Sequence, residues 1–370
     1  MGAGSFFFAG GGTGGHIYPA IAVAGKILQL QPAARIHFFC SNRSIDAHIL
    51  AGTNLEYTVL PAKSPSVSPA KFASFCKALL RSHRLAKKII AASDSPVVVG
   101  VGGFVAAPAC FSASKLKVPL VLLNIDIVPG LAGKLIARWA GEIFLQFPDT
   151  QSHFAKSKGK ISIVGCPLRD GFEHPQRGKA IEQLGLDENK KVLLITGASS
   201  GSQNINEAVV LLLQGLDAFA DGWQVVHLTG RANYEKVAEM YTNTKIKHKV
   251  LDYFDDMPDL LAAADLVVGR SGAVSVAEYA AAGVPAVCMP YPYHKDRHQY
   301  LNAGKLVEAG AAVIVDDVPD ANERAQWLWE ELQDLMRDDK KRLEMAQACR
   351  KIANLGASSA VARQLIQIVS

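Results

Sequence analysis

Residues 6–28 read FFFAGGGTGGHIYPAIAVAGKIL, a short apolar run followed by five glycines and a threonine before helical spacing resumes. The apolar run has the length of a buried strand, and the spacing predicts a helix over residues 19–30. A strand that passes through glycines into a helix start gathers unpaired backbone N–H groups around a bare backbone. This stretch therefore predicts the first strand and helix of a doubly wound α/β domain, with a site for a phosphate or sugar oxygen between them.

The same alternation of strands and helices continues along the chain and predicts parallel sheets covered on both faces. Strand-length apolar runs occupy residues 6–9, 36–40, 97–99, 120–123 and 143–145, and then 192–195, 225–228, 266–268, 286–289 and 312–315. Helical spacing in the first half covers residues 19–30, 45–50, 72–91 and 131–139. The predicted fold class is α/β, with two doubly wound Rossmann-like domains that face a cleft.

The alternation pauses at VGCPLRDGFEHPQRGKA, a polar stretch without periodicity that predicts a domain boundary. The expected division is a domain over residues 1–163, a linker over 164–180, and a second domain over 181–345. Residues 346–370 are expected to form a C-terminal helix that packs back on the first domain. Ligands of such folds bind at the carboxyl ends of the strands, so we expect the ligand-binding residues in the loops that follow the strands.

Composition excludes several classes of protein. The chain has 370 residues, 49% of them hydrophobic, which fits two globular domains, and its net charge of +5 is too small to indicate a nucleic-acid partner. Six cysteines lie scattered without metal-ligand spacing, as in reduced cytoplasmic proteins. No stretch reaches the roughly 18 apolar residues of a membrane-spanning helix, so membrane contact is expected to be peripheral.

His16 stands directly after the first glycine run, beside Thr13, Gly14 and Gly15. A tight turn would account for one or two glycines but not for five. A neutral imidazole at this place can remove the proton of an acceptor hydroxyl, although a histidine that only begins the helix is the alternative. Dinucleotide binding is the commonest interpretation of such a glycine run, but the second strand lacks the expected ribose-binding acid, since it ends in Cys40, Ser41 and Asn42.

Three further loops follow predicted strands. VVVGVGGFVAAP places Gly102, Gly103 and Phe104 beside the first loop, and LLITGASSGSQNINEAV brings Ser199 before a helix that begins near Gln203. The third, around GRSGAVSVAEYAAAGVPAV and HKDRHQYLNA, combines a helix that carries Glu278 with a polar cluster after the next strand. Glu278 could bind a ribose diol, and a solvated carboxylate on the helix surface is the alternative.

Together these motifs resemble the MurG-type family of UDP-N-acetylglucosamine:lipid-linked muramyl-pentapeptide N-acetylglucosaminyltransferases, over nearly the whole chain. The resemblance implies a glycosyltransferase-B fold, a nucleotide sugar bound mainly by the C-terminal domain, a lipid diphosphate bound by the N-terminal domain, and inversion without metal or cofactor. The implied partners are UDP-N-acetylglucosamine, an undecaprenyl-diphosphate-linked acceptor and an anionic membrane surface. The implied location is the cytoplasmic face of the inner membrane.

The resemblance also implies roles for individual residues. His16 would be catalytic, and the acceptor phosphates would meet the loops of Thr13, Gly14, Gly15, Gly102, Gly103 and Phe104. The donor diphosphate would be bound by Arg169 and Ser199, the uracil by the backbone at Phe254, and the ribose by Glu278. Gln299 and Asn302 would bind the sugar, and Ser271 is expected to be a further donor-binding residue.

Three parts of the sequence depart from the family pattern. NIDIVPGLAGK puts Asn124, Ile125 and Asp126 where Glu-Gln-Asn is usual, and Asp126 becomes the second catalytic candidate. Ser200 lies in an altered third loop, and His298 replaces a glutamine. The alternatives that remain are a related glycosyltransferase with a different donor or acceptor, a nucleotide-sugar epimerase, a non-catalytic binding protein and a dinucleotide-dependent oxidoreductase.

AKFASFCKALLRSHRLAKKII, residues 70–90, has the pattern of a basic amphipathic helix. Its apolar residues are Phe72, Phe75, Cys76, Leu79, Leu80 and Ile90, and its basic residues are Lys71, Lys77, Arg81, Arg84, Lys87 and Lys88. A membrane-facing surface and a helix that covers the sheet with a solvated basic face explain this pattern equally well.

Overall fold

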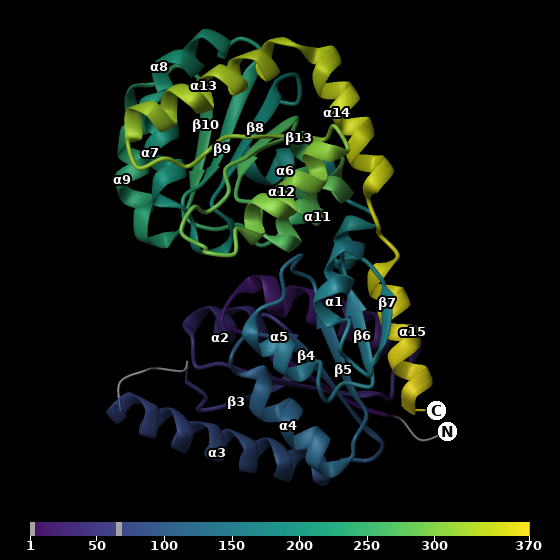
Figure 1. Cartoon of the computed structure of the whole chain (residues 1–370). Helices are drawn as coiled ribbons and strands as arrows, with labels where there is room; N and C mark the ends of the chain where they lie inside the picture. The colour runs from purple at the N-terminus through teal and green to yellow at the C-terminus, as the bar shows by residue number, and fades with distance from the viewer. Residues whose placement is uncertain (1–3, 64–68, 370) are drawn as a thin grey trace. The chain divides into compact units, whose positions relative to one another are not determined.

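The computed structural model describes residues 4–63 and 69–369, with side chains except those of residues 69–71, so the side chain expected at Lys71 lies outside the described residues. The chain divides into two compact units (Figure 1). Unit 1 comprises residues 1–169 and 356–370, and unit 2 comprises residues 170–355. Each unit is a parallel sheet with helices, as the alternating pattern predicts.

Unit 1 contains a seven-stranded sheet in the order β3-β2-β1-β4-β5-β6-β7, and every pairing is parallel. Its strands are β1 (Ser5–Gly10), β2 (Arg35–Cys40), β3 (Glu56–Val59), β4 (Pro96–Gly102), β5 (Leu120–Asn124), β6 (Glu142–Leu145) and β7 (Lys160–Ile163). The order reverses between β1 and β4, which is the switch point where ligands of doubly wound sheets bind. Cross-strand aromatic pairs support the register, since Phe8 lies opposite Phe38 with ring centroids 5.2 Å apart.

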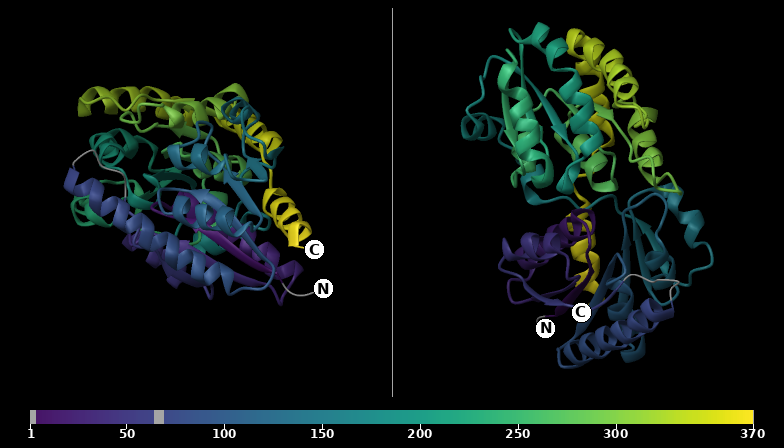
Figure 2. Two further views of the ribbon diagram at one scale, coloured as in Figure 1. Left: turned by 60° about the horizontal axis from the view of Figure 1, so that its bottom comes forward. Right: turned by 90° about the vertical axis from the view of Figure 1, so that its left-hand side faces the viewer.

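Six helices of unit 1 are α1 (Gly14–Leu30), α2 (Ser44–Ala51), α3 (Pro69–Ala91), α4 (Ala106–Leu116), α5 (Leu131–Ile136) and α15 (Ala357–Val369). The helix α1 buries Ile17, Ala20, Ala24 and Ile27, which recur every three or four residues and form one apolar face. The last helix, α15, packs on α1 (Figures 1 and 2). Ser358 Oγ donates a hydrogen bond of 2.7 Å to the carbonyl of Leu168.

Unit 2 contains a six-stranded parallel sheet in the order β10-β9-β8-β11-β12-β13. Its strands are β8 (Lys191–Thr196), β9 (Trp223–Leu228), β10 (Lys247–Leu251), β11 (Leu266–Gly269), β12 (Ala286–Cys288) and β13 (Ala312–Ile314). Its helices are α6 (Arg177–Leu184), α7 (Gln203–Leu211), α8 (Leu213–Leu216), α9 (Tyr234–Met240), α10 (Met257–Ala263), α11 (Ala273–Ala282), α12 (His298–Glu308), α13 (Ala321–Arg337) and α14 (Asp339–Ile352). Here the order reverses between β8 and β11.

The structure differs from the expected boundaries at several points. The chain passes from unit 1 to unit 2 after Arg169, inside the stretch expected as a linker, where Val164, Cys166, Leu168 and Phe172 are all buried. The stretch expected as one C-terminal helix is two helices, because α14 ends at Ile352 in unit 2 and only α15 belongs to unit 1. The helix α1 begins at Gly14, five residues before the expected start, so that Gly14, Gly15 and His16 form its first turn.

Candidate functional site

The two glycine loops of unit 1 lie against each other at the switch point between β1 and β4. A Cβ atom on Gly102 would stand 2.7 Å from Cδ2 and Nε2 of His16, and one on Gly103 would stand 2.5 Å from the carbonyl oxygen of Gly11. Both glycines also have left-handed backbone, with φ of +117° and +76°. The bare backbone thus lets one loop seat the imidazole that the other loop carries.

His16 is half-buried, and its ring is held in one orientation. Nδ1 lies 3.2 Å from the carbonyl oxygen of Gly11 and 3.4 Å from the hydroxyl of Thr13. A carbonyl oxygen only accepts hydrogen bonds, so the bond to Gly11 requires that Nδ1 donates its proton. In the neutral ring Nε2 is then the nitrogen with the free lone pair, as a general base requires.

The backbone of the first glycine loop is bound by a carboxylate that the sequence did not indicate. Asp46, in the first turn of α2, is fully buried, and its oxygens accept hydrogen bonds from Gly12 N–H (2.8 and 3.0 Å) and from Ser41 N–H (2.9 Å) and Oγ (2.6 Å). Arg43 donates a bond of 2.8 Å to the Gly12 carbonyl. The N–H of Gly12 therefore points to Asp46, which corrects the expectation that the whole loop offers free N–H groups to a phosphate.

The structure also places three other expected residues of unit 1. Arg169 stacks on Tyr18 of α1, one turn after the glycines, with its guanidinium carbon 4.4 Å from the ring centroid. Asp126 follows β5 and is half-exposed, and its backbone carbonyl accepts a bond of 2.7 Å from the buried amide of Asn124. Phe104 lies beneath Arg43, whose guanidinium carbon is 6.0 Å from the centroid of the phenyl ring.

In unit 2 the loop after β8 forms a tight turn against the end of β9. Ser199 is half-buried in a 3₁₀ turn over Ala198–Ser200, and α7 begins at Gln203 as the sequence predicts. A Cβ on Gly201 would stand 2.2 Å from the carbonyl oxygen of Thr229, and a Cβ on Gly230 would stand 2.5 Å from that of Ser200. These close backbone contacts fix the loop that carries Ser199.

Three expected donor residues meet one another around the start of α12. Ser271 Oγ donates a bond of 2.9 Å to the carbonyl of Gln299, and the amide of Asn302 donates one of 3.2 Å to the carbonyl of Ser271. Both Ser271 and Asn302 have no exposed surface, and their hydrogen bonds hold the loop. Gln299 is half-buried, and its Oε1 accepts a bond of 2.9 Å from the N–H of Tyr291.

The remaining expected residues of unit 2 lie on neighbouring loops and helices. Glu278 lies half-buried on α11, and Phe254 is 9% exposed between β10 and α10. His298 begins α12, and its ring is stacked on that of His294 with centroids 4.3 Å apart. Burial opposes ionisation of Asp296, yet its hydrogen bonds from His298 hold the pKa of this carboxyl below its usual range.

A buried ionic network supports the loops that are expected to bind the donor, and the sequence did not predict this network. Arg270 donates to Ser202 Oγ (2.7 Å), the N-cap of α7, and to the carbonyl of Met289 (2.8 Å), and it pairs with Asp317 at 2.7 Å. Arg324 of α13 lies 3.6 Å from the same carboxylate and 3.2 Å from Glu207. The pairing joins residues far apart in sequence, so spacing along the chain carries no signal of it.

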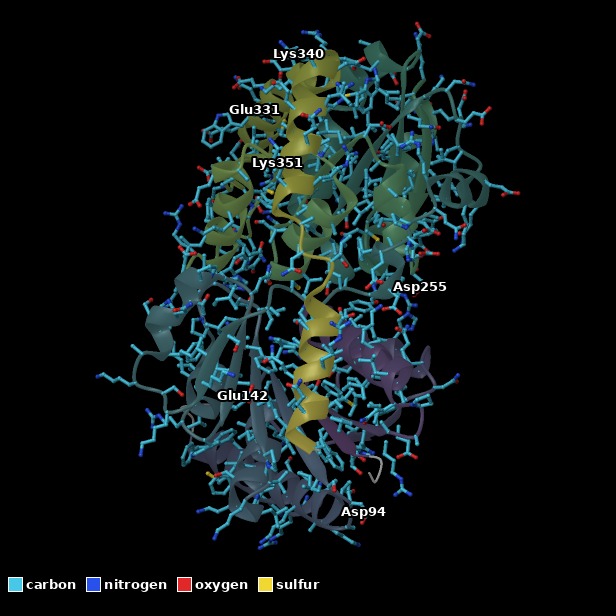
Figure 3. All side chains as sticks on the ribbon, turned by 90° about the vertical axis from the view of Figure 1, so that its right-hand side faces the viewer. Asp94, Glu142, Asp255, Glu331, Lys340 and Lys351 are labelled. Carbon is cyan, nitrogen blue, oxygen red and sulfur yellow. The ribbon has the colours of Figure 1, made fainter. Side chains whose placement is uncertain are left out.

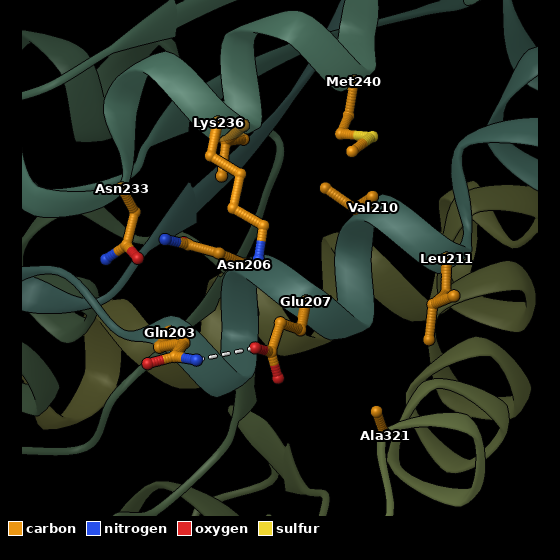
Figure 4. Close-up of a pocket in the computed structure, with 10 residues that line it drawn as sticks. Gln203, Asn206, Glu207, Val210, Leu211, Asn233, Lys236, Met240 and Ala321 are labelled. Carbon is orange, nitrogen blue, oxygen red and sulfur yellow. Dashed lines mark hydrogen bonds between the residues drawn. The ribbon is translucent and has the colours of Figure 1, made fainter.

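A cavity of about 220 Å³ lies in unit 2 between α7 and α9 (Figure 4). Its lining residues are Gln203, Asn206, Glu207, Val210, Leu211, Asn233, Lys236, Val237, Met240 and Ala321. At its polar end Gln203 donates a bond of 2.8 Å to Glu207. No residue expected to bind donor or acceptor lines this cavity, and we place the candidate site at the strand ends.

The chain matches two protein families in sequence. Residues 6–145 match the glycosyltransferase family 28 N-terminal domain, and residues 192–363 match the glycosyltransferase family 28 C-terminal domain. A relative from Desulfitobacterium hafniense is 35% identical over 351 residues, which cover 92% of this chain and 93% of the relative. That relative is named UDP-N-acetylglucosamine–N-acetylmuramyl-(pentapeptide) pyrophosphoryl-undecaprenol N-acetylglucosamine transferase.

Solved structures show the same fold. The crystal structure of Acinetobacter baumannii MurG superposes with a TM-score of 0.70 at 25% identity. The superposition covers 98% of this chain and 99% of the MurG chain. A UDP-GlcNAc 2-epimerase from Neisseria meningitidis, bound to UDP-GlcNAc, has a TM-score of 0.69 at 14% identity, over 99% of this chain and 100% of the epimerase chain. At this low identity the likeness shows only that the two proteins share a fold. These likenesses establish the glycosyltransferase-B architecture. The chain belongs to glycosyltransferase family 28 and, within it, to the MurG-type N-acetylglucosamine transferases.

Proposed function

We propose that this chain transfers N-acetylglucosamine from UDP-N-acetylglucosamine to a muramyl-pentapeptide linked through diphosphate to undecaprenol, with inversion at the anomeric carbon. The observation that carries the proposal is the 35% identity, over 92% of the chain, to a relative named for this transfer. Membership of the family favours a transferase over the oxidoreductase that the first glycine run left open.

The chemistry assigned to His16 follows from its orientation. The acceptor hydroxyl gives its proton to Nε2, and its oxygen forms a bond to the anomeric carbon of the donor. The bond from that carbon to the UDP oxygen breaks, and UDP leaves with the electron pair. The proposal rests on the bond of 3.2 Å between Nδ1 and the Gly11 carbonyl, because this bond leaves Nε2 as the proton acceptor.

The acceptor diphosphate is assigned to the N-terminus of α1. Gly14 and Gly15 lack side chains there, Thr13 makes no side-chain cap, and the first turn holds no acidic residue, so the positive end of the helix dipole is not neutralised from within the helix. A Cβ on Gly15 would meet only the Thr13 hydroxyl, at 3.6 Å, which indicates space beside this residue. Gly102, Gly103 and Phe104 are proposed to complete the acceptor loops, with Asp126 as a second catalytic candidate.

The donor is assigned to the strand ends of unit 2. We propose that Ser199 contacts the diphosphate, Glu278 the ribose, and the backbone near Phe254 the uracil. Gln299 uses Oε1 on Tyr291 and retains its amide donors for the sugar. Ser271 and Asn302 are assigned to holding this loop because both are fully buried. Arg169 is proposed as a diphosphate contact, and its stacking on Tyr18 fixes its guanidinium.

The surface of α3 supports peripheral binding to an anionic membrane. No helix within residues 4–63 and 69–369 is long and apolar enough to cross a bilayer. Phe72, Leu80 and Leu85 are 54%, 54% and 36% exposed, and they share the helix with the exposed basic residues Lys77, Arg81, Arg84, Lys87 and Lys88. The opposite face buries Ala78, Ser82, Ala86 and Ile90. Apolar and basic side chains on one surface suit an anionic bilayer, and we infer binding at the cytoplasmic face of the inner membrane.

The proposal is tested by measuring UDP release from UDP-N-acetylglucosamine with a soluble lipid-diphosphate muramyl-pentapeptide as acceptor. We expect acceptor-dependent release, and a decrease in turnover of roughly 10²–10⁴-fold in His16→Ala with little change in donor affinity. Release that prefers another UDP-sugar would point to a transferase of altered specificity. Conversion of the donor to its 2-epimer without acceptor would contradict the proposal and favour an epimerase.

A further inference from the structure

One peptide group lies between Asp46 and His16. The N–H of Gly12 donates to both Asp46 oxygens, at 2.8 and 3.0 Å, and the carbonyl of Gly11, which belongs to the same peptide group, accepts from His16 Nδ1 at 3.2 Å. The N–H and the C=O of a trans peptide point in opposite directions. The carboxylate and the imidazole are therefore bound to opposite sides of one planar, polarisable unit.

We propose that Asp46 is a positioning residue that acts on His16 through the Gly11–Gly12 peptide, as a peptide-relayed aspartate–histidine pair. A charge-assisted bond from the carboxylate polarises the peptide, so that the Gly11 oxygen becomes a stronger acceptor for Nδ1–H. The stronger bond fixes the tautomer in which Nε2 is unprotonated. It also stabilises the imidazolium that forms when Nε2 takes the acceptor proton, while Asp46 itself stays ionised.

The hydrogen-bond inventory around Asp46 fits an ionised carboxylate. Every partner found for it is a donor: the N–H of Gly12, the N–H of Ser41 and the hydroxyl of Ser41. An ionised carboxyl group only accepts, so all these bonds are satisfied together. Burial, followed by the charge of Asp46, raises the pKa of the Cys40 thiol to about 12, and this neighbour is thereby kept neutral.

The glycines of the loop are what this arrangement requires. A Cβ on Gly11 would stand 2.2 Å from Oδ2 of Asp46, so the carboxylate occupies the space that a side chain would need. Gly12 has φ of +93°, a backbone conformation that other residues rarely adopt. Arg43 holds the carbonyl of Gly12 from the neighbouring loop at 2.8 Å. The peptide between the two glycines is thus fixed along with its neighbours.

The first test reads the tautomer of His16 and needs no substrate. Protein labelled with ¹⁵N-histidine is examined by long-range ¹H–¹⁵N correlation at alkaline pH, and the His16 signals are identified by their loss in His16→Ala. We expect the Nδ1–H tautomer in the wild-type protein and a mixture with the Nε2–H tautomer in Asp46→Asn. A wild-type His16 in the Nε2–H form would overturn the inference, even if Asp46→Asn did not fold and even if the protein were an active transferase.

The second test is kinetic and rests on the proposed function. Asp46→Asn is expected to lower kcat for UDP release by roughly 10–100-fold, the usual range for groups that orient a reactive side chain, with little change in KM for UDP-N-acetylglucosamine. Asp94→Asn removes the same charge from an exposed position after α3, labelled in Figure 3, and should keep wild-type kcat. Ser41→Ala removes one bond to Asp46 but keeps its charge, and should keep the Nδ1–H tautomer. A folded Asp46→Asn protein with wild-type kcat and tautomer would overturn the relay.

Discussion

Replacing Gly102 by alanine should displace the imidazole of His16, the proposed general base, without touching the residues proposed to bind the donor. The new Cβ would stand 2.7 Å from Cδ2 and Nε2 of His16. Carbon atoms in ordinary contact lie about 3.5 Å apart or more, so the ring must move by about 0.8 Å. A displacement near 1 Å at a reacting group costs about 10²-fold in rate, which corresponds to about 2.7 kcal/mol of activation free energy.

The same substitution also strains the backbone, since Gly102 has φ of +117°. Residues forced into such a region lose about 1–3 kcal/mol of stability. Stability and turnover must therefore be measured separately, by denaturant unfolding and by UDP release at saturating donor and acceptor. We expect kcat to fall by about 10²-fold in protein that is still folded at the assay temperature, with KM for the donor little changed.

Gly25→Ala provides the matched control for this prediction. Gly25 lies within α1, the helix that carries His16, and a Cβ there would meet nothing within 4 Å. Alanine is favoured over glycine in a helix by about 1 kcal/mol, so this variant should be as stable as the wild type or more stable, with unchanged kcat. A folded Gly102→Ala enzyme that turns over at the wild-type rate would refute the placement of His16 against the second glycine loop.

Three other predictions test separate parts of the molecule. Glu278→Ala should weaken UDP-N-acetylglucosamine binding by about 1.5–3 kcal/mol in calorimetry, the range for hydrogen bonds to a charged group, whereas unchanged affinity would return Glu278 to the solvated helix surface. Burial lowers the pKa of His227 to about 3. Between pH 6.5 and 3 the unfolded chain therefore binds a proton that the folded chain does not, and the free energy of unfolding decreases as the pH falls through this range. In denaturant titrations, the free energy of unfolding should fall by about 2 kcal/mol between pH 7 and pH 5 because of His227. His227→Gln should lack this decrease. Replacing both Lys87 and Lys88 by glutamate should weaken binding to anionic vesicles, measured by sedimentation, by about 2 kcal/mol or more. Lys340→Glu is the control and should not weaken binding, since Lys340 lies on α14, where it is 87% exposed and labelled in Figure 3. Equal binding of both variants would favour a helix that only covers the sheet.

The sequence predicted the interior strands of both sheets but not all of the edge strands. Residues 56–59, 160–163 and 247–251 form β3, β7 and β10, each of which lies at the edge of its sheet. Their side chains are largely exposed or half-exposed, so their residues do not form the continuous apolar runs that indicate a buried strand. The fold class was predictable because the interior strands alternate with helices, which is the pattern of a parallel α/β sheet.

The candidate site was predictable where its residues are adjacent in the sequence. His16 and the glycines stand next to one another in the sequence, and their loops meet in the structure as the strand pattern predicts. Asp46 was not predictable, because it lies beyond the end of the second strand and reaches the first loop only through the turn into α2. Contacts between Arg270, Asp317 and Arg324 depend on tertiary packing in the same way.

The packing of α15 on α1 has a consequence for biosynthesis. The helix that carries His16 is translated near the start of synthesis, whereas the segment that covers it, with Val361, Ala362 and Leu365 fully buried, emerges from the ribosome after all of unit 2. Nascent chains of unit 1 consequently expose part of the apolar face of α1 until residues 357–369 have emerged from the ribosome. A ribosome stalled anywhere within unit 2 would hold the first Rossmann-like unit incomplete, as a client for chaperones that bind exposed apolar helices.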